Sequence, residues 1–518
     1  MAIERQPAPA QEARTAVPNQ ARRSVLLLGS EARPFAKTGG LADVLGALPS
    51  ALARLGWDAT VAIPKYRGVS AGVLAETLPI TVGGYTGDAG VFLAPLADGA
   101  RALLVDCADL YDRDALYGVG NDDYADNPLR FAFLVRAALE FAGRRGTGPS
   151  IVHAHDWQAG LAPVYLKTLY ASHPVLGGTP SIFTIHNLAY QGVFRSDWVP
   201  RLDLGWDQLA VGRLEYWGRI SFLKGGITDA DLITTVSRRY AEEIQTLEFG
   251  FGFDGILRAR RNDLVGILNG IDTRDWDPAH DPSLPKPFDA NDLSGKREAK
   301  LAVLTRYGLA TDAAALKRPL VGMVSRMVDQ KGFDLIAARA DDLVRLDAGY
   351  VVLGTGEARY QNLWTALAAA DPDRIGVHIG FDESLAHLIE GGADIFLMPS
   401  RFEPCGLNQM YSMRYVTVPV VHAVGGLADT VRDYQFVPKP DEGGPTSASA
   451  PEGGGTPTGF VFREYSPSAM VEALTRALTL FRDEWKWRAL QVAGMQEDFS
   501  WDRSAQEYVK IYERVLGI

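Results

Sequence analysis

Residues 35–56 read FAKTGGLADVLGALPSALARLG and directly follow an apolar run, SVLLLGS, at residues 24–30. The run has the length of a buried strand, and from Leu41 to Leu55 apolar residues recur at helical spacing. A lysine and two glycines therefore stand between a strand and a helix. Glycine permits a tight turn and the close approach of a ligand, and a helix N-terminus favours an anion. The stretch predicts a phosphate-binding loop to which Lys37 adds a cation.

The alternation of strand and helix continues along the chain in two series. One series of strand-like runs extends from residue 24 to about residue 235, and a second begins at LVGILNG, residues 264–270. This pattern is typical of parallel sheets covered by helices, so the fold class is α/β with two doubly wound halves. Ligands of such sheets bind beyond the carboxyl ends of the strands, which predicts a cleft between the halves.

The expected organisation has four parts and one surface loop. Residues 1–23 are a loose extension, 24–263 a first lobe, 264–495 a second lobe, and 496–518 a final helix that packs back on the first lobe. The stretch 438–459 is rich in proline, glycine and serine, and it predicts a mobile surface loop.

Composition excludes several classes of protein. The 518 residues are 47 % hydrophobic and 22 % charged, which is ordinary for a globular protein of two domains. A net charge of -11 argues against nucleic acid as a partner. Two cysteines make no disulfide framework and no paired-thiol zinc site, and they favour a reducing cytoplasm. No apolar run approaches the roughly 20 residues of a membrane span, so we expect no membrane partner.

Polar motifs stand where several of the predicted strands end. In the first half they are KTGG (37–40), HAHDWQ (153–158) and TIHNLAYQG (184–192). In the second half they are NGID (269–272), SRMVDQKG (325–332), GTGE (354–357), SRFEPCGLNQ (400–409) and AVGGLADT (423–430). Their common position predicts that they line the cleft together.

This set of motifs resembles bacterial glycogen synthases and plant starch synthases, which are retaining glycosyltransferases. The resemblance runs from about Ser24 to the C-terminus, and KTGGLADVLGALP, HAHDWQAGLAP, HNLAYQG and SRFEPCGL carry it. It implies two facing Rossmann-like lobes, the GT-B fold. It also implies transfer of glucose from ADP-glucose to the non-reducing end of an α-1,4-glucan such as glycogen, with no metal or other cofactor.

The resemblance further implies the residues of the site. The catalytic set contains a carboxylate beside the donor glucose, two cations on its phosphates and two groups near the sugar: Glu403, Arg326, Lys331, His186 and Asp156. The donor-binding set comprises Lys37, Gly39, Gly40, Asp43, Asn269, Gly354, Phe381, Cys405, Gly406, Leu407, Gly425 and Gly426. Two fixed cations suit this chemistry because negative charge grows on the departing diphosphate in the transition state.

Some motifs admit another interpretation. His153 and His155 leave a strand on one face, like the metal pair of a hydrolase barrel, but further ligand motifs at strand ends are not evident. DAD (229–231) and DWD (275–277) match an acidic metal motif, although such short matches arise by chance among 63 acidic residues. GTGE lacks the third glycine of a dinucleotide fingerprint. Cys405 fits a lining residue better than a nucleophile, since its motif contains no base.

The sequence departs from its apparent relatives at three positions, Asn408, Val424 and Phe381, and from other retaining enzymes at a fourth, Tyr411. Tyr411 stands where many retaining enzymes carry a second glutamate, which is normal for glycogen synthases. Asn408 and Val424 replace threonines that contact phosphate in bacterial relatives. Phe381 replaces a tyrosine that stacks on adenine, and the aromatic face that stacking needs is retained.

Two other functions remain open from the sequence. A related enzyme would use UDP-glucose or a small acceptor. A non-catalytic glucan-binding protein is the alternative from another class, but it would not require Lys37, Arg326, Lys331 and Glu403 together.

Overall fold

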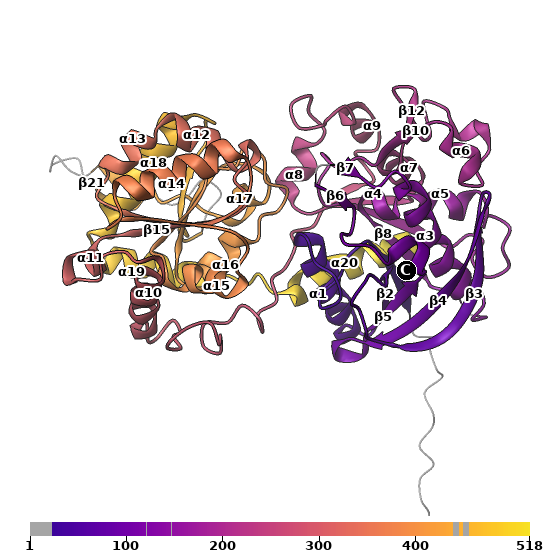
Figure 1. Ribbon diagram of the computed structural model, residues 1–518, viewed down its shortest axis with the longest axis horizontal. Helices are drawn as coiled ribbons and strands as arrows, with labels where there is room; N and C mark the ends of the chain where they lie inside the picture. The colour runs from indigo at the N-terminus through magenta and orange to yellow at the C-terminus, as the bar shows by residue number, and fades with distance from the viewer. Residues whose placement is uncertain (1–22, 121, 147, 439–444, 449–454) are drawn as a thin grey trace, which may run out of the picture.

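The computed structural model describes residues 23–120, 122–146, 148–438, 445–448 and 455–518, which form two lobes (Figure 1). The expected N-terminal extension lies outside the described residues except for Arg23. The chain enters the second lobe after residue 266 and returns to the first lobe in its last helix.

The first lobe is built on a nine-stranded sheet in the order β14-β13-β9-β8-β1-β2-β5-β4-β3. Its strands are β1 (Ser24–Leu28), β2 (Asp58–Pro64), β3 (Val73–Val82), β4 (Tyr85–Pro95), β5 (Arg101–Asp106), β8 (Ile151–His155), β9 (Ser181–Ile185), β13 (Leu232–Thr235) and β14 (Leu264–Gly266). All pairs are parallel except β3 with β4 and β4 with β5. The antiparallel hairpin at one edge was not foreseen from the sequence.

The strands of this sheet are apolar on both sides because helices cover both faces of the sheet. The chief helices of this lobe are α1 (Gly40–Arg54), α3 (Asn127–Gly143), α5 (Leu161–Lys167), α7 (Phe222–Asp229), α8 (Arg238–Glu243) and α9 (Asp254–Ala259). Leu27 and Leu28 in the middle of the sheet are fully buried, and α1 buries Leu45, Leu48 and Leu52 against it. The strand and helix predicted around the lysine and glycine loop are therefore both present.

Shorter elements complete the first lobe. They are α2 (Ala108–Tyr111), β6 (Gly118–Val119), β7 (Asp122–Asp123), α4 (Asp156–Ala159), β10 (Val193–Arg195), α6 (Trp198–Arg201), β11 (Glu215–Tyr216) and β12 (Arg219–Ser221), with 3-10 turns at Ala97–Gly99 and Trp206–Gln208. β10, β12 and β11 form a separate antiparallel sheet of three strands at the upper edge of the lobe in Figure 1.

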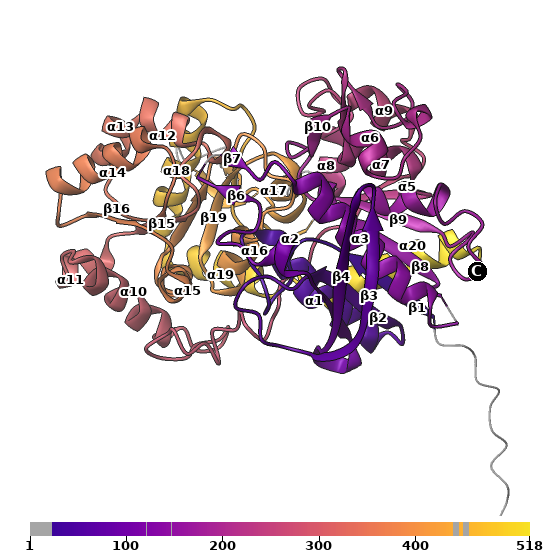
Figure 2. The same cartoon turned by 45° about the vertical axis from the view of Figure 1, so that its right-hand side comes forward.

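The second lobe has a six-stranded parallel sheet in the order β17-β16-β15-β18-β19-β22. The strands are β15 (Leu320–Val324), β16 (Gly349–Gly354), β17 (Ile375–Ile379), β18 (Ile395–Met398), β19 (Val418–His422) and β22 (Phe460–Phe462). The helices are α10 (Ser294–Tyr307), α11 (Ala313–Lys317), α12 (Phe333–Ala338), α13 (Ala340–Arg345), α14 (Ala358–Ala370), α15 (Glu383–Gly392), α16 (Asn408–Arg414), α17 (Gly425–Thr430), α18 (Pro467–Phe481) and α19 (Glu484–Met495), with a 3-10 turn at Asp329–Lys331. Helices α12, α14 and α18 cover one face of the sheet and α10, α15 and α16 the other (Figures 1 and 2).

The boundary between the lobes differs from the one expected at residues 263 and 264. β14 begins at Leu264 and pairs with β13, so LVG at 264–266 extends the first sheet instead of opening the second. Thr235 and Gly266 are partners in this ladder. The run was assigned to the wrong lobe because its apolar pattern does not identify the strand with which it pairs.

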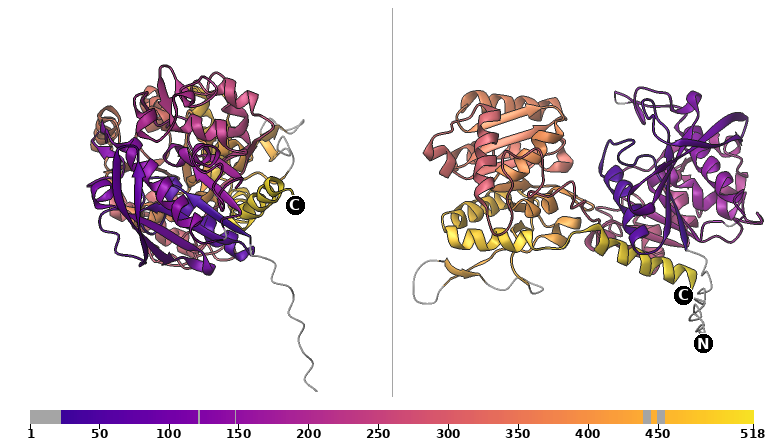
Figure 3. Two further views of the ribbon diagram at one scale, coloured as in Figure 1. Left: turned by 90° about the vertical axis from the view of Figure 1, so that its right-hand side faces the viewer. Right: turned by 90° about the horizontal axis from the view of Figure 1, so that it is seen from below.

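The last helix, α20 (Trp501–Leu516), crosses back to the first lobe. The right-hand view of Figure 3 shows it, in yellow, along the lower edge of that lobe. Trp501, Tyr508 and Tyr512 are buried in the core that α1 and β1 also form. A hydrogen bond from the Ile271 amide to the Phe499 carbonyl connects the two segments by which the chain passes from one lobe to the other.

The expected loop at 438–459 is described only in part. β20 (Phe436–Pro438) and β21 (Pro445–Ala448) form a two-stranded antiparallel hairpin, while residues 439–444 and 449–454 lie outside the described residues. Over the part of the chain that the structure describes, no helix is long and apolar enough to cross a membrane.

Candidate active site

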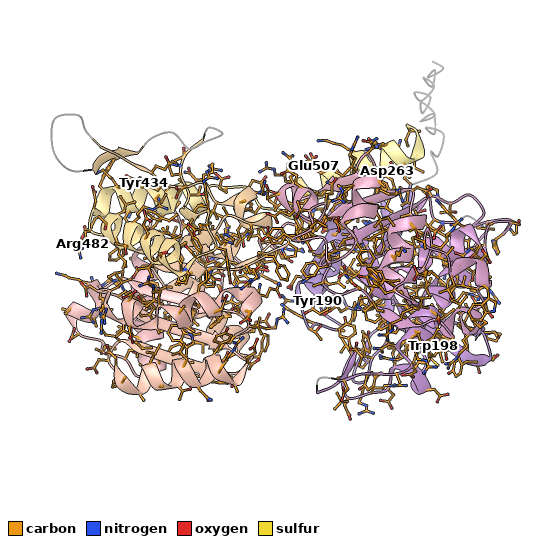
Figure 4. The ribbon with its side chains drawn as sticks, turned by 90° about the horizontal axis from the view of Figure 1, so that it is seen from above. Tyr190, Trp198, Asp263, Tyr434, Arg482 and Glu507 are labelled. Carbon is orange, nitrogen blue, oxygen red and sulfur yellow. The ribbon has the colours of Figure 1, made fainter. Side chains whose placement is uncertain are left out.

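A cleft of about 840 Å³ lies between the lobes, and residues from both lobes line it. Each sheet contributes residues from the segments that follow its strands: Glu31 after β1, Asp156 after β8, His186 after β9, Asn269 after β14, Arg326 after β15 and Glu403 after β18. Tyr190, which lies where the lobes meet in Figure 4, belongs to the same wall. The cleft is thus where parallel sheets place their ligand sites.

Lys331 and Glu403 form the central ion pair of the cleft. Lys331 Nζ lies 2.6 Å from Glu403 Oε2, and the Ser400 hydroxyl donates to the same oxygen at 3.0 Å. Glu403 is 7 % exposed, so its carboxylate depends on these partners. Removing Lys331 would leave a buried negative charge without compensation.

Arg326 extends the positive charge toward the first lobe. Its guanidinium donates to the Tyr190 hydroxyl at 3.3 Å and to Gln330 Oε1 at 3.2 Å. Tyr190 belongs to the first lobe, so the contact bridges the cleft. Arg326 and Lys331 follow β15 on one short segment, as their motif predicted.

Asp156 and His186 lie on the wall opposite Glu403. The His186 amide donates to Asp156 Oδ1 at 2.7 Å, and the His186 and His155 rings meet at 2.9 Å between Nε2 and Nδ1. Burial raises the pKa of Asp156 to about 7 and lowers the pKa of His186 to about 3. His186 is therefore a neutral imidazole at physiological pH, and Asp156 is a carboxyl that exchanges a proton near neutrality.

Glu31 is a cleft residue that the sequence analysis missed. Its carboxylate accepts hydrogen bonds from the Thr38 and Gly39 amides, the Thr38 hydroxyl and the Tyr117 hydroxyl. The amides that were expected to bind an anionic ligand are therefore already bonded to a carboxylate of the chain. The signal was an acidic residue three positions after β1, in SEARPFAKTGG.

Lys37 and Asp43 lie beside the cleft and not among the residues that line it. Lys37 Nζ is 3.0 Å from Asp43 Oδ1 and 3.9 Å from Glu383 Oε1 at the start of α15. Lys37 thus faces a carboxylate of the second lobe, while its neighbours Gly39 and Gly40 reach the cleft wall.

Four of the expected donor-binding residues line the cleft near the ion pair. They are Asn269, which follows β14 of the first lobe, and Cys405, Gly406 and Leu407 of the second lobe. Leu407 precedes α16, whose first amides have no acceptor within the helix. Burial raises the pKa of the Cys405 thiol to about 12, so Cys405 is not a thiolate nucleophile.

Six expected donor-binding residues are not among those that line the cleft: Lys37 and Asp43, described above, and Gly354, Phe381, Gly425 and Gly426. A Cβ on Gly425 would lie 1.9 Å from the carbonyl oxygen of Glu403, and a Cβ on Gly426 would lie 1.9 Å from that of Cys405. These glycines therefore allow α17 to pack on the Glu403 segment. The Gly425 amide donates to the Glu243 carboxylate. A Cβ on Gly354 would meet the Ser325 carbonyl oxygen at 1.8 Å, which explains that glycine by packing. Phe381 is 83 % exposed on the second lobe.

The structure shows what surrounds Asn408, Val424 and Tyr411, three of the positions at which the sequence differs from related enzymes. Asn408 lines the cleft, and its side-chain amide donates to the Val324 carbonyl at 3.0 Å. Val424 is buried before α17. Tyr411 stacks on Trp276 with ring centroids 3.7 Å apart, and Trp276 stacks on His387 at the same distance. Tyr411 therefore belongs to an aromatic stack.

The histidine pair and the acidic triplets have structural partners. His153 bonds Tyr512 through one ring nitrogen and Thr184 through the other, which leaves neither free for a metal. Asp229 pairs with Arg213, and Asp277 pairs with Arg414. Among the described residues there is no group of three or more histidine, cysteine or acidic side chains that could hold a metal ion.

Comparison with known proteins defines the class first. The model of the starch synthase catalytic domain matches residues 24–259, and that of glycosyl transferases group 1 matches residues 311–489. The catalytic domain of starch synthase IV from Arabidopsis thaliana, bound to ADP and acarbose, has a TM-score of 0.85 and 32 % identity, covering 96 % of this chain and all of that one. Sucrose-phosphate synthase from Thermosynechococcus elongatus, at 16 % identity and a TM-score of 0.56, shares the fold. The protein is a two-lobed glycosyltransferase with the GT-B fold.

Close relatives then define the family. The chain is 46 % identical to glycogen synthase of Anaeromyxobacter dehalogenans strain 2CP-1, covering 94 % of this chain and 98 % of the relative. It is 43 % identical to glycogen synthase of Koribacter versatilis, over 95 % and 98 %. The chain belongs to the glycogen and starch synthase family. The resemblance seen in the sequence, the GT-B fold and glycogen synthase function are thereby confirmed.

Proposed function

We propose that the protein transfers glucose from ADP-glucose to the non-reducing end of an α-1,4-glucan, with retention of configuration. The observation that carries the proposal is the pairing of Lys331 with the buried Glu403, beside Arg326, in a cleft that both lobes line. The starch synthase with a TM-score of 0.85 was solved with ADP and acarbose, which supports an adenine nucleotide and a glucan.

Arg326 and Lys331 bind the donor's diphosphate. Because the bond between glucose and phosphate breaks, negative charge grows on the leaving group, and fixed cations stabilise it most in the transition state. Lys37 adds positive charge from the first lobe once it exchanges its contact with Asp43 for the phosphate. In the free protein Glu403 neutralises Lys331, which keeps both side chains in place for the donor.

Glu403 lies beside the donor glucose and stabilises positive character at the anomeric carbon. Retention follows from a front-side, ion-pair-like substitution, in which the departing phosphate accepts the proton of the acceptor hydroxyl. His186, neutral because it is buried, positions the sugar by hydrogen bonding, and Asp156 binds near the same sugar. The lobes exclude water and so favour transfer over hydrolysis.

The proposal requires no metal ion, since the cationic side chains neutralise the diphosphate. Both cysteines are free and buried, which suits a reducing cytoplasm. UDP-glucose as donor or a small sugar as acceptor is the nearest alternative. A glucan-binding protein without activity is the alternative from another class, and the pairing of Lys331 with the buried Glu403 in the cleft disfavours it.

The test is a transfer assay with ADP-glucose or UDP-glucose and with glycogen or glucose as the acceptor. We expect ADP release with glycogen and ADP-glucose, and an α-anomeric product by NMR. Lys331→Ala and Glu403→Ala should each lower kcat about ten- to a hundredfold, because each loses a charge-assisted contact worth about 1.5–3 kcal/mol and leaves its partner uncompensated.

Lys167→Ala is the matched control, because Lys167 pairs with Asp231 on the surface of the first lobe and lies outside the cleft lining. It should keep full activity. Near-normal turnover in Lys331→Ala or Glu403→Ala would refute their assigned roles, and absence of ADP release from the unchanged protein would refute the proposed activity.

A further inference from the structure

The turn between β11 and β12 exposes a tryptophan in an unfavourable backbone conformation. Tyr216 pairs with Arg219, so Trp217 and Gly218 form a two-residue hairpin turn with φ of 53° and 75°. Turns of this type favour Asn-Gly, because both residues have positive φ. A bulky residue with positive φ is an outlier that costs free energy. Trp217 is also 84 % exposed.

The turn is held rigidly by the rest of the lobe. The ammonium of Lys224, a residue only 7 % exposed, donates to the Val211 carbonyl at 2.6 Å and to the Glu215 carbonyl at 2.5 Å. The Tyr216 ring stacks on Phe253 with centroids 4.7 Å apart. The indole is therefore displayed on an ordered support, which lowers the entropic cost of binding a ligand.

The turn is continuous with the wall of the cleft. The carbonyl of Phe251 accepts hydrogen bonds from Gln191, a cleft residue, at 2.8 Å and from the Tyr216 hydroxyl at 3.1 Å. Val193 of β10 also lines the cleft, and β10 pairs with β12 in the same small sheet. Figures 1 and 2 place β10 at the upper edge of the first lobe.

The chemistry around the indole fits a sugar chain. A glucose ring has an apolar C–H face and a rim of hydroxyls. An exposed aromatic ring buries the apolar face, and the exposed Arg219 beside the turn offers hydrogen-bond donors to the rim. The acceptor of the proposed reaction is a polymer longer than the cleft, so the chain must leave it along some surface.

We propose that Trp217 is a remote binding site for the acceptor glucan, on which a sugar ring several units from the reacting end stacks. The inference rests on the proposed function for the identity of the polymer. It predicts that long acceptors gain affinity from Trp217 and that short acceptors, which end inside the cleft, do not.

The main experiment measures glycogen binding without catalysis, by native electrophoresis in gels with and without glycogen. Trp217→Asn should raise the dissociation constant about tenfold, or about 1.4 kcal/mol. Asparagine suits the turn, so the variant's Tm should equal or exceed that of the unchanged protein. Trp217→Phe keeps an aromatic face and should bind within about threefold of the unchanged protein. Trp485→Ala, which removes an 80 % exposed tryptophan from the second lobe, is the matched control and should bind as before.

A transfer assay gives an independent readout. The ratio of KM for glycogen to KM for maltotriose should rise about tenfold in Trp217→Asn and stay constant in Trp485→Ala. Equal retardation of Trp217→Asn and the unchanged protein would overturn the inference. So would an equal loss in Trp217→Phe, or a change in sedimenting mass with binding intact, which would make the turn a contact between copies of the chain.

The two proposals fail separately. Retardation by glycogen that depends on Trp217, without glucose transfer from ADP-glucose, would refute the proposed activity and leave the binding site standing. Normal transfer with no effect of Trp217 would refute only the binding site.

Discussion

Glu31 is a buried carboxylate that holds the loop carrying Lys37. It is 4 % exposed and accepts from two consecutive backbone amides and two hydroxyls. The loop's conformation therefore depends on this side chain as well as on its glycines. Because the charge also faces Asp156, it contributes to the raised pKa of that carboxyl.

Glu31→Gln should loosen this loop, because an amide group has one acceptor oxygen where the carboxylate has two. We expect the free energy of unfolding to fall by about 1–3 kcal/mol and KM for ADP-glucose to rise severalfold. Denaturant unfolding and initial-rate kinetics measure both. An unchanged KM together with the expected loss of stability would limit Glu31 to a folding role.

Asp156→Asn tests the buried carboxyl through pH. The pKa of Asp156 is raised to about 7 in the folded protein, so the protonated form is favoured there and stability is lost as pH rises toward 7. The asparagine variant has no ionisable carboxyl at this position, so its unfolding free energy does not fall with pH for this reason. Relative to the unchanged protein it should gain about 1–3 kcal/mol in unfolding free energy between pH 5 and pH 8. A difference that is the same at both pH values would contradict the raised pKa.

At the scale of elements, the segment that follows β18 is bonded to the start of α17, and together they hold Glu403 in position. The Gly426 amide donates to the carbonyls of Glu403 and Pro404 at 3.1 and 3.2 Å. From the first lobe, the Ser237 hydroxyl donates to the Pro404 carbonyl at 2.5 Å. The segment that carries Glu403 is thus held by hydrogen bonds from two other elements.

Gly425→Ala should displace this support. Gly425 has φ of 43°, and its added Cβ would lie 1.9 Å from the Glu403 carbonyl oxygen. We expect kcat to fall more than about tenfold and stability to fall by about 1–3 kcal/mol. Gly255→Ala in α9, where nothing lies within 4 Å of the new Cβ, is the control and should affect neither quantity adversely. Normal kcat in Gly425→Ala would show that the Glu403 segment is not so constrained.

Across the whole molecule, charged groups bridge the lobes on the Lys37 side of the cleft. Arg33 Nη2 lies 3.4 Å from Asp275 and 3.6 Å from Glu383, and Lys37 lies 3.9 Å from Glu383. These pairs are partly exposed and therefore contribute little net free energy. They can exchange partners at low cost when the lobes move.

Under the proposed function, ADP contacts cations that belong to different lobes, so donor binding should draw the lobes together. We expect the radius of gyration, measured by small-angle X-ray scattering, to fall when ADP and a maltooligosaccharide are added. Lys331→Ala, which loses a phosphate contact, should show a smaller change at the same ligand concentration. Identical scattering of the unchanged protein with and without ligand would contradict closure.

Much of the fold could be read from the sequence because its strands are apolar runs bounded by glycine motifs. The strand and helix around KTGG, and the position of SRFEPCGLNQ after an apolar strand, follow from local pattern. The pairing of β14 with β13 did not follow, since partner choice depends on contacts far apart in the chain. The antiparallel hairpin of β3 and β4 was also missed, although its two strands are separated only by Gly83 and Gly84 and its signal is local.

The cleft likewise contains residues that the sequence predicts and contacts that only the structure shows. Lys331 and Glu403 were predicted by their motifs, but their mutual ion pair joins segments 72 positions apart. Gly425 and Gly426 were expected to contact the donor, and the structure shows in addition that they allow close backbone packing. Glu31 was not predicted because the sequence does not show which groups donate hydrogen bonds to its carboxylate.

By itself, the sequence determined the two-lobed α/β architecture, the family and the motifs that carry charge, because each is encoded in short-range pattern. Only the tertiary structure decided which residues face the cleft, which carboxyl is buried enough to hold a proton near neutrality, and where Trp217 is displayed. Burial, pairing and desolvation arise when distant segments meet, so their energies belong to the folded chain and not to any single stretch of it.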